Sequence, residues 1–254
     1  MNALYAEWTK LRTAPAAIWL LLAVIVTTVA VSTLTIAAAT CHATGCGQDP
    51  GRISLTGVDV GQAVVAVLAV LAIGDEYGTG MIRVSLTATP RRLSLLTAKL
   101  ATLAGPVLVA SVVAVAASLL VGRLILPGRG FTPAHGFDLG SSAALSAAFR
   151  MVLYLTLVAA LSLGVATAVR DSAAAIGVVL GLLYLFPVAA SLVGDRAVQR
   201  LLEQIGPMSA GLNAQATVGL RGLPLTPWPG LGVVALWAAG ALLLGGLALR
   251  VRDA

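Results

Sequence analysis

Long apolar runs without charged side chains alternate with short polar segments along this chain. They lie between Arg12 and Asp49, Lys99 and Arg123, Arg150 and Arg170, Asp171 and Asp195, and Arg221 and Arg250. A helix needs roughly 20 apolar residues to cross the hydrocarbon core of a bilayer, which is about 30 Å thick. Each of the five runs is long enough, so the pattern predicts five transmembrane helices.

A sixth apolar segment, from Val60 to Gly74, is too short to span the core alone, because a helix of this length rises only about 22 Å. Burying Asp59 would cost about 2.5 to 3.5 kcal/mol, so we extend this helix outward only to about Leu55 and expect Asp59 near the surface. The sequence thus predicts an all-α polytopic membrane protein whose single domain covers residues 1–254. Its six helices are expected at about 15–38, 55–74, 95–121, 145–169, 172–194 and 231–249.

The distribution of Lys and Arg predicts that both termini lie in the cytoplasm. Basic residues are dense in the short connections on the side of the termini and sparse in the longer connections on the other side. This asymmetry is typical of cytoplasmic loops. The first apolar run is more than 20 residues long and lacks a convincing cleavage pattern, so we expect it to be retained as a transmembrane helix.

The composition supports a lipid environment and argues against a nucleic-acid partner. Hydrophobic residues make up 59% of the chain and charged residues only 10%, whereas about 25% charged residues are usual in a soluble domain. The formal net charge is +6, but the basic residues stand at the ends of predicted helices without clustering. Anchoring in the bilayer therefore explains them better than nucleic-acid binding.

The segment before the first apolar run has the pattern of a short amphipathic helix. Its apolar residues recur at helical spacing while its charged residues fall on other faces. The pattern predicts either a separate interfacial helix over residues 2–13 or an ordinary Trp and Lys anchor of the first transmembrane helix. The residues that define it are Leu4, Glu7, Trp8, Lys10, Leu11 and Arg12.

The connection between the second and third predicted helices, residues 74–92, is the most informative polar segment. Two glycines permit a sharp turn at its start, and Pro90 stops a helix at its end. Between them, Ile82 and Leu86 share one helical face and Arg83 stands on another. The segment is either a short amphipathic helix at the cytoplasmic surface, suited to docking a cytosolic partner, or a plain loop with positive-inside arginines.

The remaining polar positions favour structural roles. Cys41 and Cys46 share an external loop, where a local disulfide is favoured over free thiols or a metal site. Asp59, Gln62 and Arg150 are candidates for lining a pathway, although helix-end residues that reach the lipid headgroups are the favoured interpretation. Beyond the fifth span, a periodic segment predicts an amphipathic helix over 198–205, and a second short helix is expected at about 210–219.

Sequence motifs for catalysis or nucleotide binding are missing. The only lysines, Lys10 and Lys99, do not follow the glycine pattern of a phosphate-binding loop. The sequence also lacks the common metalloprotease and nucleophile-elbow motifs. We therefore expect no enzyme activity, no metal and no cofactor in this chain.

Two motifs carry a resemblance to a known family. The first is Glu7-x-x-Lys10-Leu11-Arg12, which precedes the first span. The second comprises Glu76-Tyr77-Gly78-Thr79-Gly80-x-x-Arg83, Leu86, Pro90-Arg91-Arg92 and Lys99. With the six-span layout, these motifs resemble bacterial ATP-binding-cassette type 2 exporter permeases, especially the actinobacterial members.

The resemblance implies an N-terminal elbow helix over residues 1–13, a coupling helix within residues 76–92 and external helices between spans five and six. It also implies two permease chains, as a homodimer or a related heterodimer, and cytosolic ATPases that bind ATP and Mg. Closure of the ATPases would push the coupling helix and reorient spans one, two and five around an interfacial pathway. Glu76 and Arg83 would orient the coupling region by charge pairing, while Ile82 and Leu86 would dock into the ATPase.

The function expected on these grounds is export of an amphipathic compound, such as a lipid, drug or peptide, across the bacterial cytoplasmic membrane. The chain would act as the permease subunit, and a separate ATPase would supply the energy. The alternative is a membrane subunit that anchors or regulates a complex without transport. A lipid-modifying enzyme is a weaker possibility, because the sequence lacks a clustered acidic, His or Cys site.

Overall fold

The computed structural model describes residues 5, 8–10, 13, 15–41, 48–78, 81, 92–131 and 141–252. All elements in this part of the chain are helices. Six of the described helical segments are long and apolar enough to cross a membrane, which confirms the predicted all-α architecture with six spans.

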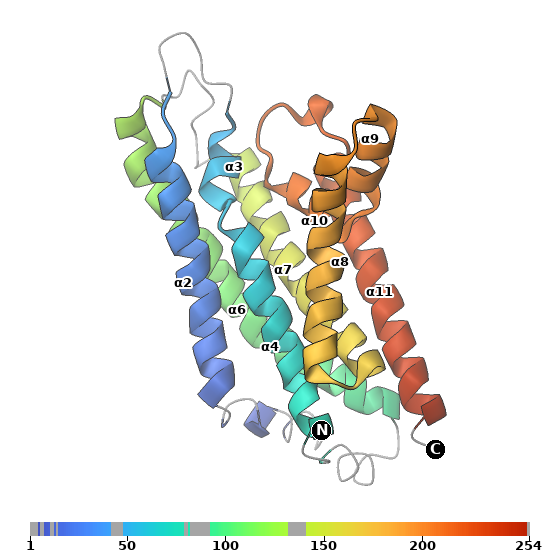
Figure 1. Ribbon diagram of the computed structural model, residues 1–254. Helices are drawn as coiled ribbons and strands as arrows, with labels where there is room; N and C mark the ends of the chain where they lie inside the picture. The colour runs from blue at the N-terminus through green and yellow to red at the C-terminus, as the bar shows by residue number, and fades with distance from the viewer. Residues whose placement is uncertain are drawn as a thin grey trace.

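The helices run in chain order through one bundle (Figure 1). They are α2 (Pro15–Ala38), α3 (Pro50–Leu55), α4 (Val58–Gly78), α6 (Arg92–Ile125), η1 (Leu126–Arg129), α7 (Ser142–Val169), α8 (Ser172–Leu192), α9 (Arg196–Ile205), α10 (Pro207–Leu212), η3 (Asn213–Gln215), η4 (Leu220–Gly222) and α11 (Pro227–Arg252). We call the end of the bundle where α2 begins and α11 finishes the terminal end (Figure 1). The opposite end, which carries α3, α9 and α10, is the distal end.

The second span is longer than the sequence predicted. It covers Pro50–Gly78, 29 residues, because α3 leads directly into α4. The side chain of Asp49 accepts hydrogen bonds from the first free backbone N–H groups of α3, and Pro50 occupies the first helical position. These start signals place the beginning of the helix at Pro50 instead of near Leu55. Asp59 consequently lies inside the helical segment and is partly buried, while its expected position near the membrane surface stays a prediction.

The third and sixth spans also exceed their predicted lengths. Helix α6 has 34 residues, and α11 begins at Pro227, before the expected start at 231. Hydropathy gives only the apolar centre of a span, whereas backbone hydrogen bonding continues into the more polar flanks. The other spans begin and end within a few residues of their expected positions.

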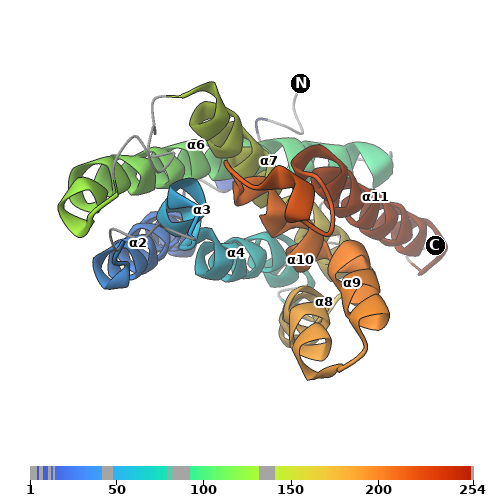
Figure 2. The ribbon, with the colours of Figure 1, turned by 90° about the horizontal axis from the view of Figure 1, so that it is seen from above.

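Helix α7 forms the centre of the bundle and packs against α4, α6, α8 and α11. Seen from above, α4 and α7 lie between the α2–α6 pair on one side and α8 and α11 on the other (Figure 2). The α7–α11 contact depends on glycine, since a Cβ on Gly164 would lie 2.5 Å from the backbone carbon of Ala241. Helix backbones that approach this closely leave room only for the smallest residues.

The distal segment between α8 and α11 is fastened to the bundle by polar side chains. Helix α9 confirms the predicted amphipathic helix, while the second helix, α10, is shorter and earlier than the expected 210–219. The guanidinium of Arg150 on α7 donates to the carbonyl oxygens of Ala214 and Ala216, each at 3.1 Å. Arg150 is buried in these contacts, so its interpretation as a headgroup-seeking residue is wrong.

Candidate functional site

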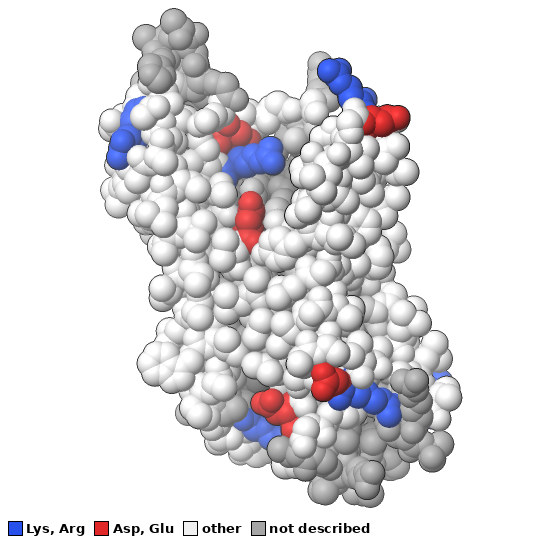
Figure 3. Space-filling model, in the orientation of Figure 1, with Lys and Arg blue, Asp and Glu red and all other residues white. Residues whose placement is uncertain are grey.

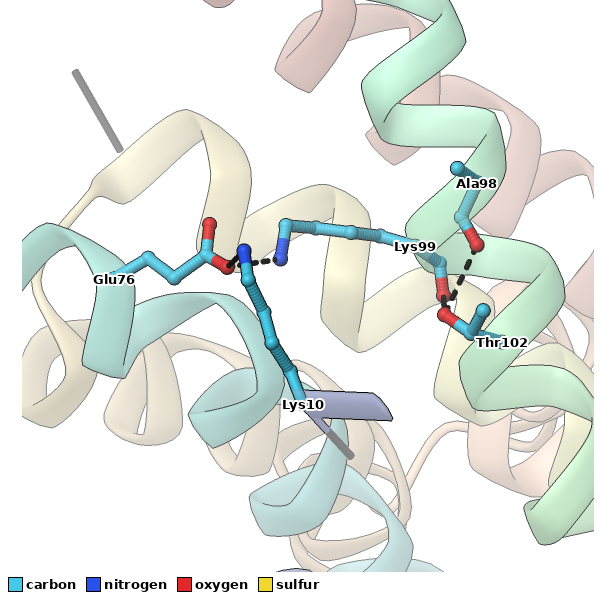
Figure 4. Close-up of polar contacts among 5 residues, drawn as sticks. All are labelled: Lys10, Glu76, Ala98, Lys99 and Thr102. Atoms are coloured by element: carbon cyan, nitrogen blue, oxygen red, sulfur yellow. Dashed lines mark hydrogen bonds and ion pairs between the residues drawn. The ribbon is translucent and has the colours of Figure 1, made fainter. Parts of the chain in front are cut away.

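The terminal end of α4 carries a glutamate that joins three segments of the chain. The Oε1 atom of Glu76 accepts a hydrogen bond from Nζ of Lys10 at 2.9 Å and lies 2.8 Å from Nζ of Lys99 (Figure 4). Lys10 precedes α2, and Lys99 lies near the start of α6. A single carboxylate oxygen therefore connects the segment before α2 to α4 and α6. We call these three residues the ion cluster.

The ion cluster is largely shielded from solvent. The side chains of Glu76 and Lys99 are only 6% and 4% exposed, whereas that of Lys10 is 41% exposed. Buried charges lose their hydration, so they require a close countercharge. The Glu76–Lys99 pair satisfies this requirement inside the protein, and Lys10 adds a second cation from the rim. Removing a member of the buried pair should therefore disturb this region more than removing Lys10.

A cavity of about 340 Å³ opens beside the ion cluster between the terminal ends of α2, α4 and α6. Its lining includes two lysines, Lys10 and Lys99, and two acids, Asp75 and Glu76, so the formal charges cancel. Among the described residues, Oε2 of Glu76 is buried without a hydrogen-bond partner. The described contacts of this carboxylate with the two lysines are thus both made by Oε1.

The neighbouring residue, Tyr77, connects α4 to the opposite side of the bundle. Its hydroxyl donates to the carbonyl oxygen of Thr167 near the end of α7 at 3.4 Å. The guanidinium carbon of Arg170, in the α7–α8 turn, lies 5.9 Å from the centre of the Tyr77 ring, within cation–π range. Arg170 also donates to the carbonyl oxygen of Ala248 on α11 at 2.8 Å. Two consecutive residues of α4, Glu76 and Tyr77, therefore contact the segment before α2, α6, α7 and the α7–α8 turn.

Two of the predicted site residues, Lys10 and Glu76, come together in the ion cluster, although they are distant in sequence. Gly78 is the last residue of α4 and has no positive φ, so the described part of the chain shows no glycine turn there. Trp8 has helical backbone and an exposed side chain, and only the backbone of Arg92 is described. The elbow helix and the coupling helix both remain predictions.

The other predicted coupling and elbow residues lie outside the described residues. They are Glu7, Leu11, Arg12, Thr79, Gly80, Ile82, Arg83, Leu86, Pro90 and Arg91. The expected pairing of Glu76 with Arg83 therefore stays a prediction, and the described partners of Glu76 are the two lysines.

The loop between α2 and α3 at the distal end contains one described cysteine, Cys41, which is part of a disulfide bond. Cys46, the other cysteine of the sequence, lies outside the described residues, so the expected pairing stays a prediction. Within the described ranges, no group of three or more His, Cys, Asp or Glu side chains is placed to hold a metal ion.

The structure adds polar contacts that sequence reasoning missed. The hydroxyl of Tyr154 on α7 donates to Oε1 of Gln62 on α4, and both side chains are fully buried. The favoured interpretation of Gln62 as a helix-end residue that reaches the headgroups is therefore wrong. Tyr184 on α8 donates to the backbone oxygen of Asp59 at 2.6 Å. The available signal was the presence of polar residues in otherwise apolar helices, but the sequence could not identify their partners.

Comparison with known proteins gives one family match. Residues 3–188 match the family model described as "ABC-2 family transporter protein". This range includes the ion cluster, the first four spans and most of the fifth. No curated protein matches the chain.

Proposed function

This chain belongs to the ABC-2 family of transporter proteins, and from that premise we propose that it is the permease subunit of an exporter driven by a separate ATPase. Membership of the family and the six apolar helices establish a multi-pass membrane protein. The proposal adds the direction of transport, an amphipathic cargo and a bacterial cytoplasmic membrane as the location. The terminal end of the bundle would face the cytoplasm, in line with the positive-inside distribution of Lys and Arg.

The single observation that carries the proposal is the contact of Glu76 with both Lys10 and Lys99. We propose that a cytosolic ATPase, which binds ATP and Mg, docks on the connection after α4 and displaces it when it closes. Glu76 would transmit this displacement to the segment before α2 and to α6. Tyr77 would transmit it to the α7–α8 turn. A push at one connection would then move several spans together instead of bending α4 alone.

The complete transporter in this proposal contains a second permease chain, either identical or related, and a pair of ATPases. Chains of this family normally pair with a cytosolic ATPase. The transport pathway would lie between the two permease chains and would be bordered by α2, α4 and α8, which correspond to spans one, two and five. ATP hydrolysis would therefore take place on the partner chains.

Co-purification tests the docking step. Tagged protein is extracted in mild detergent, and a co-purifying chain with a phosphate-binding loop is identified by mass spectrometry and assayed for ATP hydrolysis. Combining Ile82→Asp with Leu86→Asp should abolish its recovery, because buried charges would replace the proposed apolar docking face. Leu220→Asp is the matched control, since it places the same charge on an exposed apolar residue at the distal end. Unchanged recovery of the ATPase with the double variant would contradict the docking step.

Transport assays test the coupling step. Glu76→Gln keeps the size of the side chain but removes the charge that holds both lysines. In the assembled transporter, this variant should retain ATPase binding while export per ATP hydrolysed falls. If no ATPase accompanies the wild-type chain under any mild extraction, the anchor or regulatory alternative is favoured.

A further inference from the structure

A second cavity opens at the distal end of the bundle, remote from the ion cluster. It has a volume of about 530 Å³ and lies between the α3–α4 span, α8, α9, α10 and the connection to α11. Acidic and basic side chains gather around a hollow at this end of the molecule (Figure 3). We call this cavity the distal cup, and its defining residues are Arg52, Asp59, Pro187, Glu203, Met208 and Asn213.

The carboxylate of Asp59 is fixed in the wall of the distal cup. Its Oδ1 atom accepts a hydrogen bond from Nε2 of Gln215 at 2.8 Å. The Tyr184 hydroxyl holds the backbone oxygen of the same residue at 2.6 Å. Two other segments therefore hold Asp59, one by its carboxylate and one by its backbone, although an acidic side chain within a span is costly. Acidic residues inside transmembrane helices commonly mark ligand or ion sites.

An independent observation points to a ligand in the same cavity. Asn213 lines the distal cup, is only 8% exposed, and its Nδ2 atom is buried without a hydrogen-bond partner among the described residues. Buried polar groups nearly always have partners in folded proteins, so an unpaired amide donor at a cavity wall calls for an acceptor oxygen. A bound molecule with an exposed oxygen would supply it.

The charges of the distal cup have both signs. Asp59 and Glu203 contribute carboxylates, and Arg52 contributes a guanidinium that interacts electrostatically with Asp59. A ligand with a primary ammonium group would donate to the carboxylates. An anionic oxygen group on the same ligand would accept from Arg52 and Asn213. Only a zwitterion uses both sets of groups.

The rest of the wall favours an amphiphile over a small polar zwitterion. Pro187 and Ala190 of α8 and Met208 and Leu212 of α10 line the same cavity. These side chains offer apolar surface next to the charged groups, so a headgroup that carries a hydrocarbon chain buries more surface than a free headgroup.

We propose that the distal cup binds the headgroup of a zwitterionic amphiphile in which a primary ammonium is joined to an anionic phosphate, as in a phosphoethanolamine lipid. The ammonium contacts Asp59 and Glu203, and the phosphate contacts Arg52 and Asn213. Binding at the distal cup does not require coupling to an ATPase. The site can therefore be tested on the purified chain alone, independently of the proposed transport cycle.

The test measures binding of tritiated lysophosphatidylethanolamine to the full chain in dodecyl maltoside micelles, with empty micelles as background. Wild-type protein should bind one equivalent saturably. Asp59→Asn keeps an acceptor for Gln215 but loses the charge, and it should weaken binding about tenfold or more. Asp171→Asn is the matched control, because it replaces the same residue type at an exposed helix start at the terminal end, far from the distal cup. It should bind like wild type.

Three competitors resolve which part of the ligand is recognised. Lysophosphatidylglycerol lacks the ammonium and dodecylammonium lacks the phosphate, so both should displace the label poorly. Arg52→Gln should weaken lysophosphatidylethanolamine binding but leave dodecylammonium binding unchanged or stronger. Free phosphoethanolamine should compete only at much higher concentration. Equal competition by free phosphoethanolamine would overturn the amphiphile assignment.

Two outcomes would overturn the site itself. One is non-saturable binding by the wild type, and the other is wild-type affinity in both Asp59→Asn and Arg52→Gln. Arg52 is exposed, so its replacement keeps the test decisive even if the Asp59 variant fails to fold.

Discussion

Replacement of Glu76 by Gln tests whether the ion cluster holds the terminal end together. The variant leaves the ammonium of Lys99, whose side chain is 4% exposed, without the carboxylate that lies 2.8 Å away in the wild type. Breaking a buried ion pair by removing one partner typically costs about 3 to 5 kcal/mol, because the remaining charge stays desolvated. In a protein of this size, about 1 kcal/mol shifts Tm by about 2 to 4 °C. We therefore expect Tm to fall by about 6 to 20 °C.

A double-mutant cycle separates this effect from a general loss of packing. Lys99→Met removes the buried cation and leaves Glu76 with Lys10. Combining it with Glu76→Gln removes both buried charges, and such replacements are often close to neutral. The double variant should therefore be more stable than Glu76→Gln alone, with a coupling energy of at least about 3 kcal/mol, because most of the loss of the single variant is recovered.

Thermal unfolding in dodecyl maltoside micelles, followed by differential scanning fluorimetry, provides the measurement for all the variants. Lys10→Met is the control, since the Lys10 side chain is 41% exposed and surface pairs contribute only about 0 to 1 kcal/mol. The reasoning is refuted if the losses of the two single variants simply add in the double variant. It is also refuted if Lys10→Met lowers Tm as much as Glu76→Gln.

Two further predictions concern the scaffold. Gly164→Ala should lower Tm, at a cost of about 1 to 3 kcal/mol, because the added Cβ would lie 2.5 Å from the backbone of α11. Gly177→Ala should be tolerated, because a Cβ at this position would have no atom within 4 Å. Asp49→Ala should destabilise the distal end by about 1 to 3 kcal/mol, because Asp49 both caps α3 and accepts from the backbone N–H of Thr217 at 2.6 Å. Thermal unfolding tests the first prediction, and faster amide hydrogen exchange in α3 and around Thr217 tests the second. Equal Tm values for the two glycine variants, or unchanged exchange, would contradict them.

Local patterns were sufficient to predict the helices. Six spans and the amphipathic helix α9 follow from hydropathy and from a repeat of apolar residues, which depend only on neighbouring positions. The start of the second span could not be predicted in the same way. Its first residue is set by the Asp49 cap and by Pro50, which are local start signals that hydropathy does not detect.

The candidate site was only half predictable. The motif residues Lys10, Glu76 and Lys99 were all identified from sequence, but Glu76 was expected to pair with Arg83, seven positions away in the chain. The partner of a charge depends on which helices pack side by side, and hydropathy contains no such information. Gln62 and Arg150 were misplaced for the same reason. Each of these polar residues in an apolar helix was assigned to the lipid headgroups, although its side chain forms hydrogen bonds with a neighbouring segment of the protein.

The length of α6 makes the arrangement of this helix in the protein depend on the thickness of the bilayer. Its 34 residues extend about 51 Å, roughly 20 Å more than the hydrocarbon core requires. A helix with such hydrophobic mismatch tilts or projects beyond the core, and its tilt changes with the thickness of the surrounding lipid. Lys99 lies in the first turns of this helix, so the height at which it meets Glu76 depends on that tilt. Reconstitution in lipids of graded chain length would therefore change the geometry of the ion cluster without any mutation.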